Sequence, residues 1–308
     1  MISVVFPGQG SQKIGMGSDL YNKFDQAKYI FKNADEILGY KISDLILNGP
    51  IDKLNQTTFT QPAIYLIGHV MCEILKKETN FFKNNFSYFA GHSLGEYTAL
   101  TTANAISFEQ GLQLLKNRGE AMQSALPLGD GGMLAVLGVE TEEINKIINE
   151  NFQNIKCFLA NDNSKGQLIL SGRNAELEKF VLLLKEKKIK NIKLPVSAPF
   201  HCELMRTATI KMEKIINDQK IENPKYKVVS NVTASEYKNT DEIRELLIKQ
   251  IESPVRWRES VEYIISKGTN TFVEIGPGKV LTGLIKRINK DVKVLNIDTL
   301  EDIQDIKI

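Results

Sequence analysis

Short apolar runs recur along this chain, and most are followed by a turn and then by residues with helical periodicity. Strands that alternate with helices in this way are typical of a parallel sheet with helices over both of its faces. The pattern therefore predicts an α/β fold. Five runs predict its strands, at Ile2–Phe6, Phe86–Ala90, Lys227–Asn231, Thr271–Ile275 and Val292–Ile297.

The rhythm changes between Gly132 and Val196. Here the pattern predicts strand, helix, strand, strand, helix, strand, which is the βαββαβ order of a ferredoxin-like unit. We interpret residues 129–197 as a smaller domain inserted into a larger one formed by residues 1–128 and 198–308, with the chemistry in the cleft between them. The six elements are expected at Met133–Val139, Glu142–Asn149, Lys156–Asn161, Gln167–Ser171, Ala175–Lys187 and Asn191–Val196.

Composition and charge narrow the classes of function. With 308 residues and 42% hydrophobic content, the chain is long enough for a sizeable core in two domains. Its net charge of +2 provides no overall field that would attract nucleic acid or a membrane. Cys72, Cys157 and Cys202 lack the spacing of a disulfide framework or a zinc site. Without a long apolar run or a signal peptide, we expect a soluble, cytoplasmic protein that binds no metal.

The strongest chemical signal is Gly91-His92-Ser93-Leu94-Gly95, which lies between a predicted strand and the helical composition of Glu96–Ala105. This is the context of a nucleophile elbow, in which a tight turn exposes the serine hydroxyl. Glycine is expected on both sides because the turn leaves no room for a Cβ. The Leu94 N–H then faces the oxygen that becomes negative when Ser93 attacks a carbonyl. The motif predicts that Ser93 is the nucleophile of an enzyme that forms a covalent ester.

A serine nucleophile needs a base, and the chain has three histidines. His92 precedes the serine and should point away from its Oγ at a sharp turn. His69 lies in an apolar helical run, where a structural histidine is the commoner case. His201, in the segment Ser197–His201 that leaves the inserted unit, is therefore the candidate base. No aspartate is assigned as a third member, because a backbone carbonyl can hold the imidazole tautomer equally well.

Three other features stay ambiguous from the residues alone. The loop Phe6-Pro7-Gly8-Gln9-Gly10 lacks the third glycine of a dinucleotide motif, and it is either a ligand-binding loop that offers the Gln9 amide or a solvated turn. Arg118 lies in a predicted helix over 110–123, where most arginines are solvated. The turn at 276–279 precedes another helix, and it either cradles a phosphate or simply connects strand to helix.

Taken together, these residues resemble the malonyl-CoA:acyl carrier protein transacylase family. The resemblance runs in register over nearly the whole chain. It is carried by FPGQGSQ near the start, GHSLGEYTAL at 91–100, Asn117-Arg118-Gly119, Pro199-Phe200-His201, Gln250 before Pro254-Val255-Arg256-Trp257, and EIGPGKVLTGL at 274–284. The family fold that it implies is a hydrolase-like α/β domain with a ferredoxin-like insertion.

The resemblance implies a role for each matching residue. Ser93 would carry the acyl group with His201 as its base, and Gln9 and the Leu94 N–H would form the oxyanion hole. Arg118 would pair with the free carboxylate of the malonyl group, while the backbone carbonyl of Gln250 would hold His201. Further residues implied at the substrate are Phe200, typical of malonyl-selective members, Met122, and Asn163 in an expected loop at 161–166.

The implied reaction is a ping-pong transfer of malonyl from malonyl-CoA to the phosphopantetheine thiol of acyl carrier protein, for fatty acid biosynthesis. It requires no metal, nucleotide or organic cofactor, and family members are commonly monomers. Acyl carrier protein is acidic, so a basic patch should dock it; Lys190, Lys286 and Arg287 are candidates, with solvated surface as the alternative.

Two other functions fit parts of the same pattern. A serine esterase or thioesterase would use the same elbow and histidine, and only Arg118 and the FPGQGSQ loop speak against it. A carrier-protein docking module without catalytic activity could have kept the fold, although the intact Ser93, His201 and Arg118 argue for an enzyme.

Overall fold

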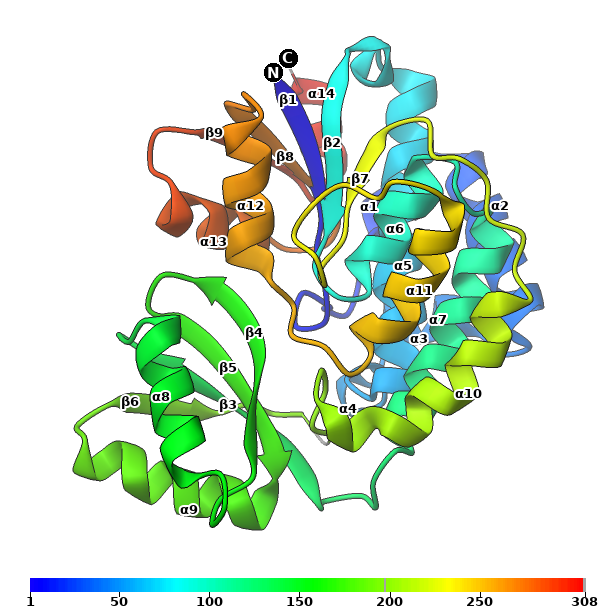
Figure 1. The fold of residues 1–308 in the computed structure, drawn as a ribbon. Coiled ribbons are helices and arrows are strands. Elements are labelled where there is room, and N and C mark those ends of the chain that lie inside the picture. Colours follow the sequence, from blue (N-terminus) through cyan, green and yellow to red (C-terminus); the bar gives the residue numbers. More distant parts are fainter. Residues whose placement is uncertain (197, 307–308) are drawn as a thin grey trace.

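The computed structural model describes residues 1–196 and 198–306 and contains two separate sheets (Figure 1). The larger sheet has five parallel strands in the order β7-β2-β1-β8-β9, so the predicted α/β fold with a parallel sheet is confirmed. Its strands are β1 (Ile2–Phe6), β2 (Phe86–Gly91), β7 (Lys227–Val229), β8 (Thr271–Ile275) and β9 (Lys293–Ile297).

Helices cover both faces of this sheet, which explains why its strands are continuous apolar runs. On one face, Val4 and Phe6 of β1 pack with α1 (Ser18–Lys23), α2 (Asp25–Leu38), α3 (Ile42–Asn48), α4 (Ile51–Leu54), α5 (Thr57–Glu78), α6 (Gly95–Thr102), α7 (Phe108–Gln123), α10 (Arg206–Asn217), α11 (Thr240–Gln250) and α14 (Leu300–Asp305). On the other, Val5 packs with α12 (Trp257–Ser266) and α13 (Val280–Ile288). Two short 3-10 turns are η1 (Phe81–Lys83) and η2 (Glu203–Met205).

The smaller sheet is antiparallel, with the order β4-β5-β3-β6. Its elements follow the predicted strand-helix-strand-strand-helix-strand order: β3 (Gly131–Leu137), α8 (Thr141–Asn151), β4 (Cys157–Ser164), β5 (Gln167–Arg173), α9 (Asn174–Glu186) and β6 (Lys190–Lys193). Alternate residues face opposite sides. Leu134 and Val136 of β3 pack under α8 and α9, whereas Met133 and Ala135 face the larger unit.

Most strands begin or end a few residues from where the sequence predicts, and three of these differences have a clear physical cause. β3 starts at Gly131 rather than Met133 because the two glycines already pair with β5. β6 ends at Lys193 rather than Val196, since residues 194–196 turn into the cleft between the sheets. β7 ends at Val229 rather than Asn231, because the chain turns at 230–234. Ser197, where the expected insertion ends, lies outside the described residues.

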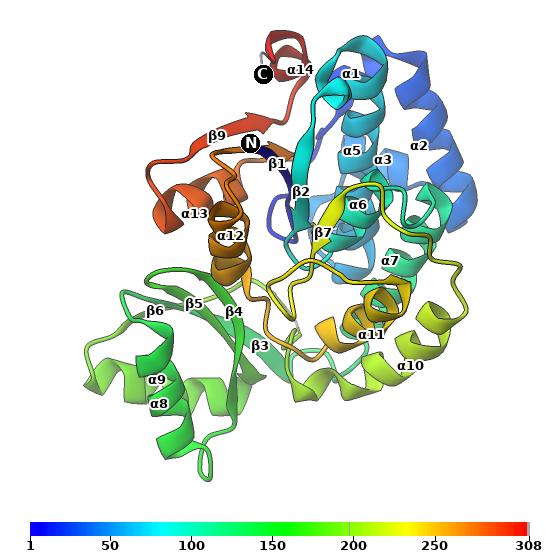
Figure 2. The ribbon, with the colours of Figure 1, turned by 45° about the horizontal axis from the view of Figure 1, so that its top comes forward.

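The carboxyl ends of β1, β2 and β7 lie at the same edge of the larger sheet, and this edge faces the smaller sheet (Figures 1 and 2). In an open parallel sheet the crevice beyond the carboxyl ends of the strands is the usual ligand site. The chain reaches this edge at the FPGQGSQ loop, the serine elbow and the turn after β7. The described residues contain no helix whose length and apolar character would let it span a lipid bilayer.

The smaller unit depends on a core of its own, in which Phe180 of α9 is fully buried. We expect Phe180→Ala to lower the free energy of unfolding by about 3–5 kcal/mol, because it leaves a cavity among packed side chains. Leu182 of the same helix is 61% exposed, so Leu182→Ala should change stability by less than about 0.5 kcal/mol. Urea unfolding of both variants measures this; equal losses would show that the core is not where the structure places it.

Candidate active site

The serine elbow is the tightest point of the fold. A Cβ on Gly91 would lie 1.9 Å from the carbonyl carbon of Gly95, and a Cβ on Gly95 would lie 2.3 Å from the Phe6 oxygen at the end of β1. Both glycines are therefore required by the approach of backbone to backbone, as the motif predicts. Ser93 between them has φ 54°, in the left-handed region that costs a non-glycine residue of order 1 kcal/mol. The elbow holds this strained residue at the cleft.

The structure brings His201 to Ser93 from 108 residues further along the chain. The distance from Ser93 Oγ to His201 Nε2 is 2.8 Å, and that from His201 Nδ1 to the Gln250 carbonyl oxygen is also 2.8 Å. Since a carbonyl only accepts, Nδ1 carries the proton and Nε2 presents a lone pair to the serine hydroxyl. Burial, and then the positive charge of Arg118, lower the pKa of His201 to about 3. The imidazole is therefore held neutral, ready to accept a proton.

Arg118 is buried beside the nucleophile, so the common expectation of a solvated helical arginine is wrong here. Its Nη2 donates to Ser93 Oγ at 3.1 Å and to the Gln250 side-chain oxygen at 2.8 Å, and its Nη1 donates to Gln61 at 2.7 Å. All three acceptors are neutral, and Arg118 forms no ion pair with any residue that the structure describes. A buried cation without a carboxylate partner is a strong attractor for an anionic group.

Sequence reasoning missed the residues that support the elbow from below. Asn231, in the turn after β7, accepts from the Ser93 N–H at 2.7 Å and donates to the Gly91 carbonyl at 2.7 Å. Glu96 of α6 is fully buried, and it accepts from the Asn231 N–H, the Gln250 side chain and the Tyr237 hydroxyl. The only available signal was Glu96 within GHSLGEYTAL; nothing near Asn231 sets it apart from a loop asparagine.

Glu96 is the acid closest to this network, and its environment changes its titration. Burial raises its pKa to about 7, although the donors from Tyr237, Asn231 and Gln250 and the charge of Arg118 oppose the rise. Three donors converge on its two oxygens, which is the pattern of an ionised acceptor. Glu96 therefore balances Arg118 from a distance, with the Gln250 amide between the two charges.

The residues expected at the oxyanion line the same cleft as Ser93. Leu94 and Gln9 both line the cleft, and the Leu94 N–H donates to no acceptor in the described part of the chain. The Gln9 side chain donates to the Thr57 hydroxyl at 3.3 Å. Glycine is required before Gln9 for a different reason from the expected contact with a ligand. A Cβ on Gly8 would lie 2.5 Å from the His92 carbonyl oxygen. Gly8 thus lets the first loop touch the elbow.

A cleft of about 430 Å³ opens above these groups, between the two sheets. Its walls include the predicted substrate residues Met122, Phe200 and Asn163. Asn163 does not lie in a loop as expected, because β4 continues to Ser164 and turns directly into β5. Its side-chain oxygen is 2.8 Å from His92 Nε2, so His92 contacts the smaller sheet rather than serving as the base. A wider hollow between α7 and α10 contains none of the predicted site residues.

The remaining candidates lie outside this centre. The His69 ring stacks on Phe108 at 4.3 Å, in keeping with a structural role. The start of α13 is already occupied by a carboxylate, because Glu274 accepts from the N–H groups of Leu281 and Thr282, which argues against a phosphate there. Lys190, Lys286 and Arg287 are exposed, and Arg287 donates to Gln167 at the cleft. Within the described residues, no group of three or more His, Cys, Asp or Glu could hold a metal ion.

Comparisons with known proteins agree on one family. The acyl transferase domain model matches residues 4–303. A malonyl CoA-acyl carrier protein transacylase of Bacillus subtilis is 40% identical over 98% of this chain and 95% of its own length. The crystal structure of a protein of the same name from Clostridium perfringens has a TM-score of 0.92, with 40% identity over 98% of this chain and 95% of that one. A structure described as a type II PKS acyl-carrier protein in complex with its malonyl-transacylase has a TM-score of 0.94, with 36% identity over 98% and 97%.

The burial of His201 predicts how stability depends on pH. The folded protein keeps this imidazole neutral down to about pH 3, whereas the unfolded chain protonates it as pH falls through 6.5. Wild type should therefore lose stability relative to His201→Gln as pH falls below 6.5, by about 1.4 kcal/mol for each pH unit and proton. Glu96 titrates in both proteins, so its contribution cancels in the difference.

Urea unfolding of the two proteins between about pH 8 and pH 5 measures this difference. A difference that stays constant over this range would show that the folded protein protonates His201 as readily as the unfolded chain does.

Proposed function

The chain belongs to the malonyl CoA-acyl carrier protein transacylase family of acyltransferases, and we propose that it transfers malonyl from malonyl-CoA to the phosphopantetheine thiol of acyl carrier protein. The pathway is fatty acid biosynthesis, in the cytoplasm. One observation carries the proposal: the Ser93 hydroxyl lies between a neutral imidazole at 2.8 Å and a buried guanidinium at 3.1 Å that has no ion-pair partner among the described residues. The first makes an acyl-enzyme nucleophile, and the second selects an acyl group that carries a carboxylate.

The first half-reaction loads the enzyme. His201 Nε2 takes the proton as Ser93 Oγ attacks the thioester carbon, and the carbonyl oxygen becomes an oxyanion held by the Leu94 N–H and Gln9. When the intermediate collapses, the C–S bond breaks and His201 returns the proton to the CoA sulfur. Malonate is left as an ester on Ser93. The Gln250 carbonyl stabilises the imidazolium that exists between these two proton transfers.

The second half-reaction reverses these steps with another thiol. His201 takes the proton of the phosphopantetheine thiol, whose sulfur attacks the Ser93 ester. The same N–H groups hold the oxyanion, and Ser93 Oγ leaves with the proton from His201. Because CoA leaves the acyl-enzyme before the second thiol reacts, the cycle is a ping-pong exchange, and it consumes no cofactor because serine and histidine end as they began. We propose that the enzyme needs no metal, nucleotide or organic cofactor and acts as a monomer.

Selection for malonyl follows from the charge and shape of the cleft. A guanidinium can meet a carboxylate with two parallel charge-assisted hydrogen bonds, which a buried site strengthens. Arg118 uses three of its five N–H groups on Ser93, Gln61 and Gln250, and its Nε has no hydrogen-bond partner among the described residues, so the guanidinium has donors to offer a carboxylate. An acetyl group would leave the cation unpaired. Phe200 and Met122 line the same cleft and restrict the space for a branched acyl chain.

The carrier protein approaches the mouth of the cleft in this proposal. Arg287 contacts Gln167, a residue of the cleft wall, and Lys286 precedes it on the exposed side of α13. Lys190 begins β6 on the smaller unit. Cations on both units would attract an acidic carrier before its pantetheine arm enters. The solved complex of a similar transacylase with an acyl-carrier protein supports this kind of partner.

The same family membership supports a finer description of the fold. We describe the larger unit as hydrolase-like, because a strand, a serine elbow and a helix follow one another at the carboxyl edge of its parallel sheet. The smaller unit is ferredoxin-like in its element order and antiparallel pairing. The domain limits at 128/129 and 197/198 stay as proposed from the sequence.

A malonyl ester on Ser93 is the direct test of the proposal. Intact-protein mass spectrometry after mixing with malonyl-CoA should show one malonyl adduct on wild type and none on Ser93→Ala. Adding a pantetheine acceptor should then yield malonyl-pantetheine rather than free malonate. Free malonate as the main product would identify a thioesterase, and absence of an adduct on native wild type would favour a docking module.

Replacement of Arg118 tests the selection. We expect Arg118→Ala to lower malonyl transfer by roughly 10²–10⁴, because two charge-assisted hydrogen bonds of about 1.5–3 kcal/mol each are lost. Acetyl transfer should hold or rise, since an unpaired cation no longer faces the methyl group. Steady-state rates with both thioesters measure the change, with Asn117→Ala on the same helix as the control. Equal losses on both substrates would remove the carboxylate role.

A further inference from the structure

The end of β4 is held by the larger unit as well as by its own sheet. Its pairing with β5 is irregular between Leu159 and Asn161 and again between Asp162 and Ser164. At this point the backbone of Val255, just before α12, bridges to β4: the Val255 N–H donates to the Ala160 oxygen at 2.8 Å, and the Asp162 N–H donates to the Val255 oxygen at 3.0 Å. The last part of β4 is thus shared between the two units.

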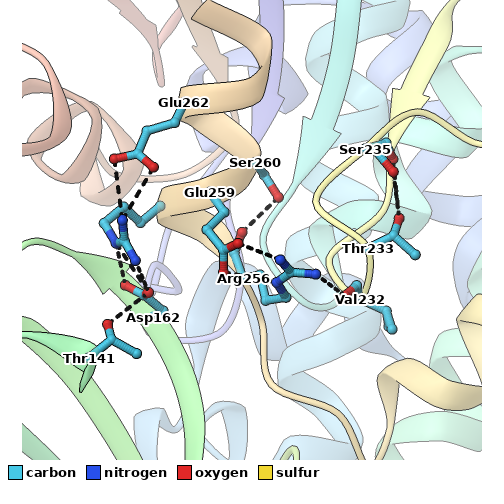
Figure 3. Close-up of polar contacts among 10 residues, drawn as sticks. Thr141, Asp162, Val232, Thr233, Ser235, Arg256, Glu259, Ser260 and Glu262 are labelled. Carbon is cyan, nitrogen blue, oxygen red and sulfur yellow. Dashed lines mark hydrogen bonds and ion pairs between the residues drawn. The ribbon is translucent and has the colours of Figure 1, made fainter. Parts of the chain in front are cut away.

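An ion pair reinforces this junction. Asp162 has a side chain only 3% exposed, and it pairs with Arg258 of α12, whose side chain is 18% exposed. Arg258 Nη2 lies 2.8 Å from Asp162 Oδ2, and its Nε donates to both oxygens at 3.1 Å. Thr141, at the start of α8, donates to the same carboxylate at 3.0 Å (Figure 3). Glu262 of α12 forms a second ion pair with Arg258. Because both charges are largely withdrawn from water, this pair is more than a surface contact.

The neighbours of Asp162 on β4 reach the active site. The Asn163 oxygen is 2.8 Å from His92 Nε2, and the Asn161 amide nitrogen is 3.4 Å from the same atom. Both asparagines line the cleft, and the side-chain oxygen of Asn161 is buried without a hydrogen-bond partner among the described residues. Since side chains alternate along a strand, fixing Asp162 on one side fixes Asn161 and Asn163 on the other.

The segment that bonds to β4 follows directly after the residue that holds His201. Gln250, which holds His201 by its backbone carbonyl, lies five residues before Val255. On the other side of Val255, the backbone N–H of Arg256 donates to the backbone oxygen of Asn231 at 3.0 Å. We propose that Asp162 and Arg258 are positioning residues for acyl transfer: their ion pair holds the Asn161–Asn163 end of β4 against His92 and so sets the opening through which the thioester enters. This inference rests on the function proposed above.

Arg256 provides a matched comparison within the same helix turn. It pairs with Glu259 and donates to the Val232 carbonyl at 3.2 Å, and all three belong to the larger unit (Figure 3). Removing its side chain deletes an arginine and an ion pair at the start of α12 but no hydrogen bond to β4. Arg256→Gln therefore separates an effect on the cleft from an effect on the helix.

The test compares Asp162→Asn, Arg258→Gln, the double variant and Arg256→Gln with wild type. Two rates are measured: acylation of Ser93 by malonyl-CoA, as kcat and KM, and reaction of Ser93 with a small sulfonyl fluoride. The small reagent needs the elbow and His201 but not the shaped cleft. We expect Asp162→Asn and Arg258→Gln to raise KM about tenfold while kcat and the sulfonyl fluoride rate change less than about twofold. The double variant should resemble either single variant, because one interaction is lost in all three.

Several outcomes would overturn the inference. The pair would be only a structural contact if KM were unchanged in Asp162→Asn or Arg258→Gln, or if it rose as much in Arg256→Gln. The same would follow if kcat, the sulfonyl fluoride rate and stability all fell together. Should Asp162→Asn fail to fold, Arg258→Gln and Arg258→Lys carry the test. Lysine keeps the charge but cannot place two nitrogens on the carboxylate as Arg258 does, so an unchanged KM in both variants has the same meaning. Failure of wild type to acylate would instead contradict the proposed function, so the two claims fail separately.

Discussion

The buried amide of Gln250 is the contact on which the rest of the site depends. Its backbone carbonyl fixes the His201 tautomer, its side-chain oxygen accepts from Arg118, and its side-chain nitrogen donates to Glu96 and to the Ser93 carbonyl. Every polar group that one residue can offer near the nucleophile is used. An aspartate in the place of that carbonyl would also orient the imidazole, but it would place a negative charge beside the group that must accept a carboxylate substrate.

The side-chain amide of Gln250 also separates the two buried charges of the site. A guanidinium and a carboxylate are both buried, yet the Gln250 amide keeps them apart. If Glu96 bound Arg118 directly, the pair would satisfy itself and leave nothing for a ligand. With the amide between them, Glu96 stabilises the cation from a distance while the guanidinium stays open on the side of Ser93. Burial, and then the same cation, lower the pKa of His201 and keep it neutral, so one charge contributes to both the base and the recognition of substrate.

Much of this arrangement could be predicted from the sequence, because local geometry dictates local residues. Gly91 is required by backbone contacts within a few residues, and Gly95 by the Phe6 oxygen at the end of the neighbouring strand, so the spacing of the two glycines around a serine was enough to indicate the elbow. The convergence of His201 on Ser93 could be inferred because only three histidines exist. Asn231, Gln61 and Asp162 could not be found in the same way, because their roles depend on partners from distant elements and their residue types are ordinary in loops and strands. The strand limits were wrong where the chain bends toward the cleft, which hydrophobic periodicity does not register.

The insertion ends close to the base in the sequence, because β6 ends at Lys193 and His201 follows eight positions later. The smaller unit therefore cannot swing far from its partner without pulling on the imidazole. A separation of the two units that displaced His201 would lengthen its 2.8 Å contact with Ser93, and without this base an ester on Ser93 would react more slowly with water. The topology of the insertion thus links activation of the serine to the arrangement of the two units around the cleft.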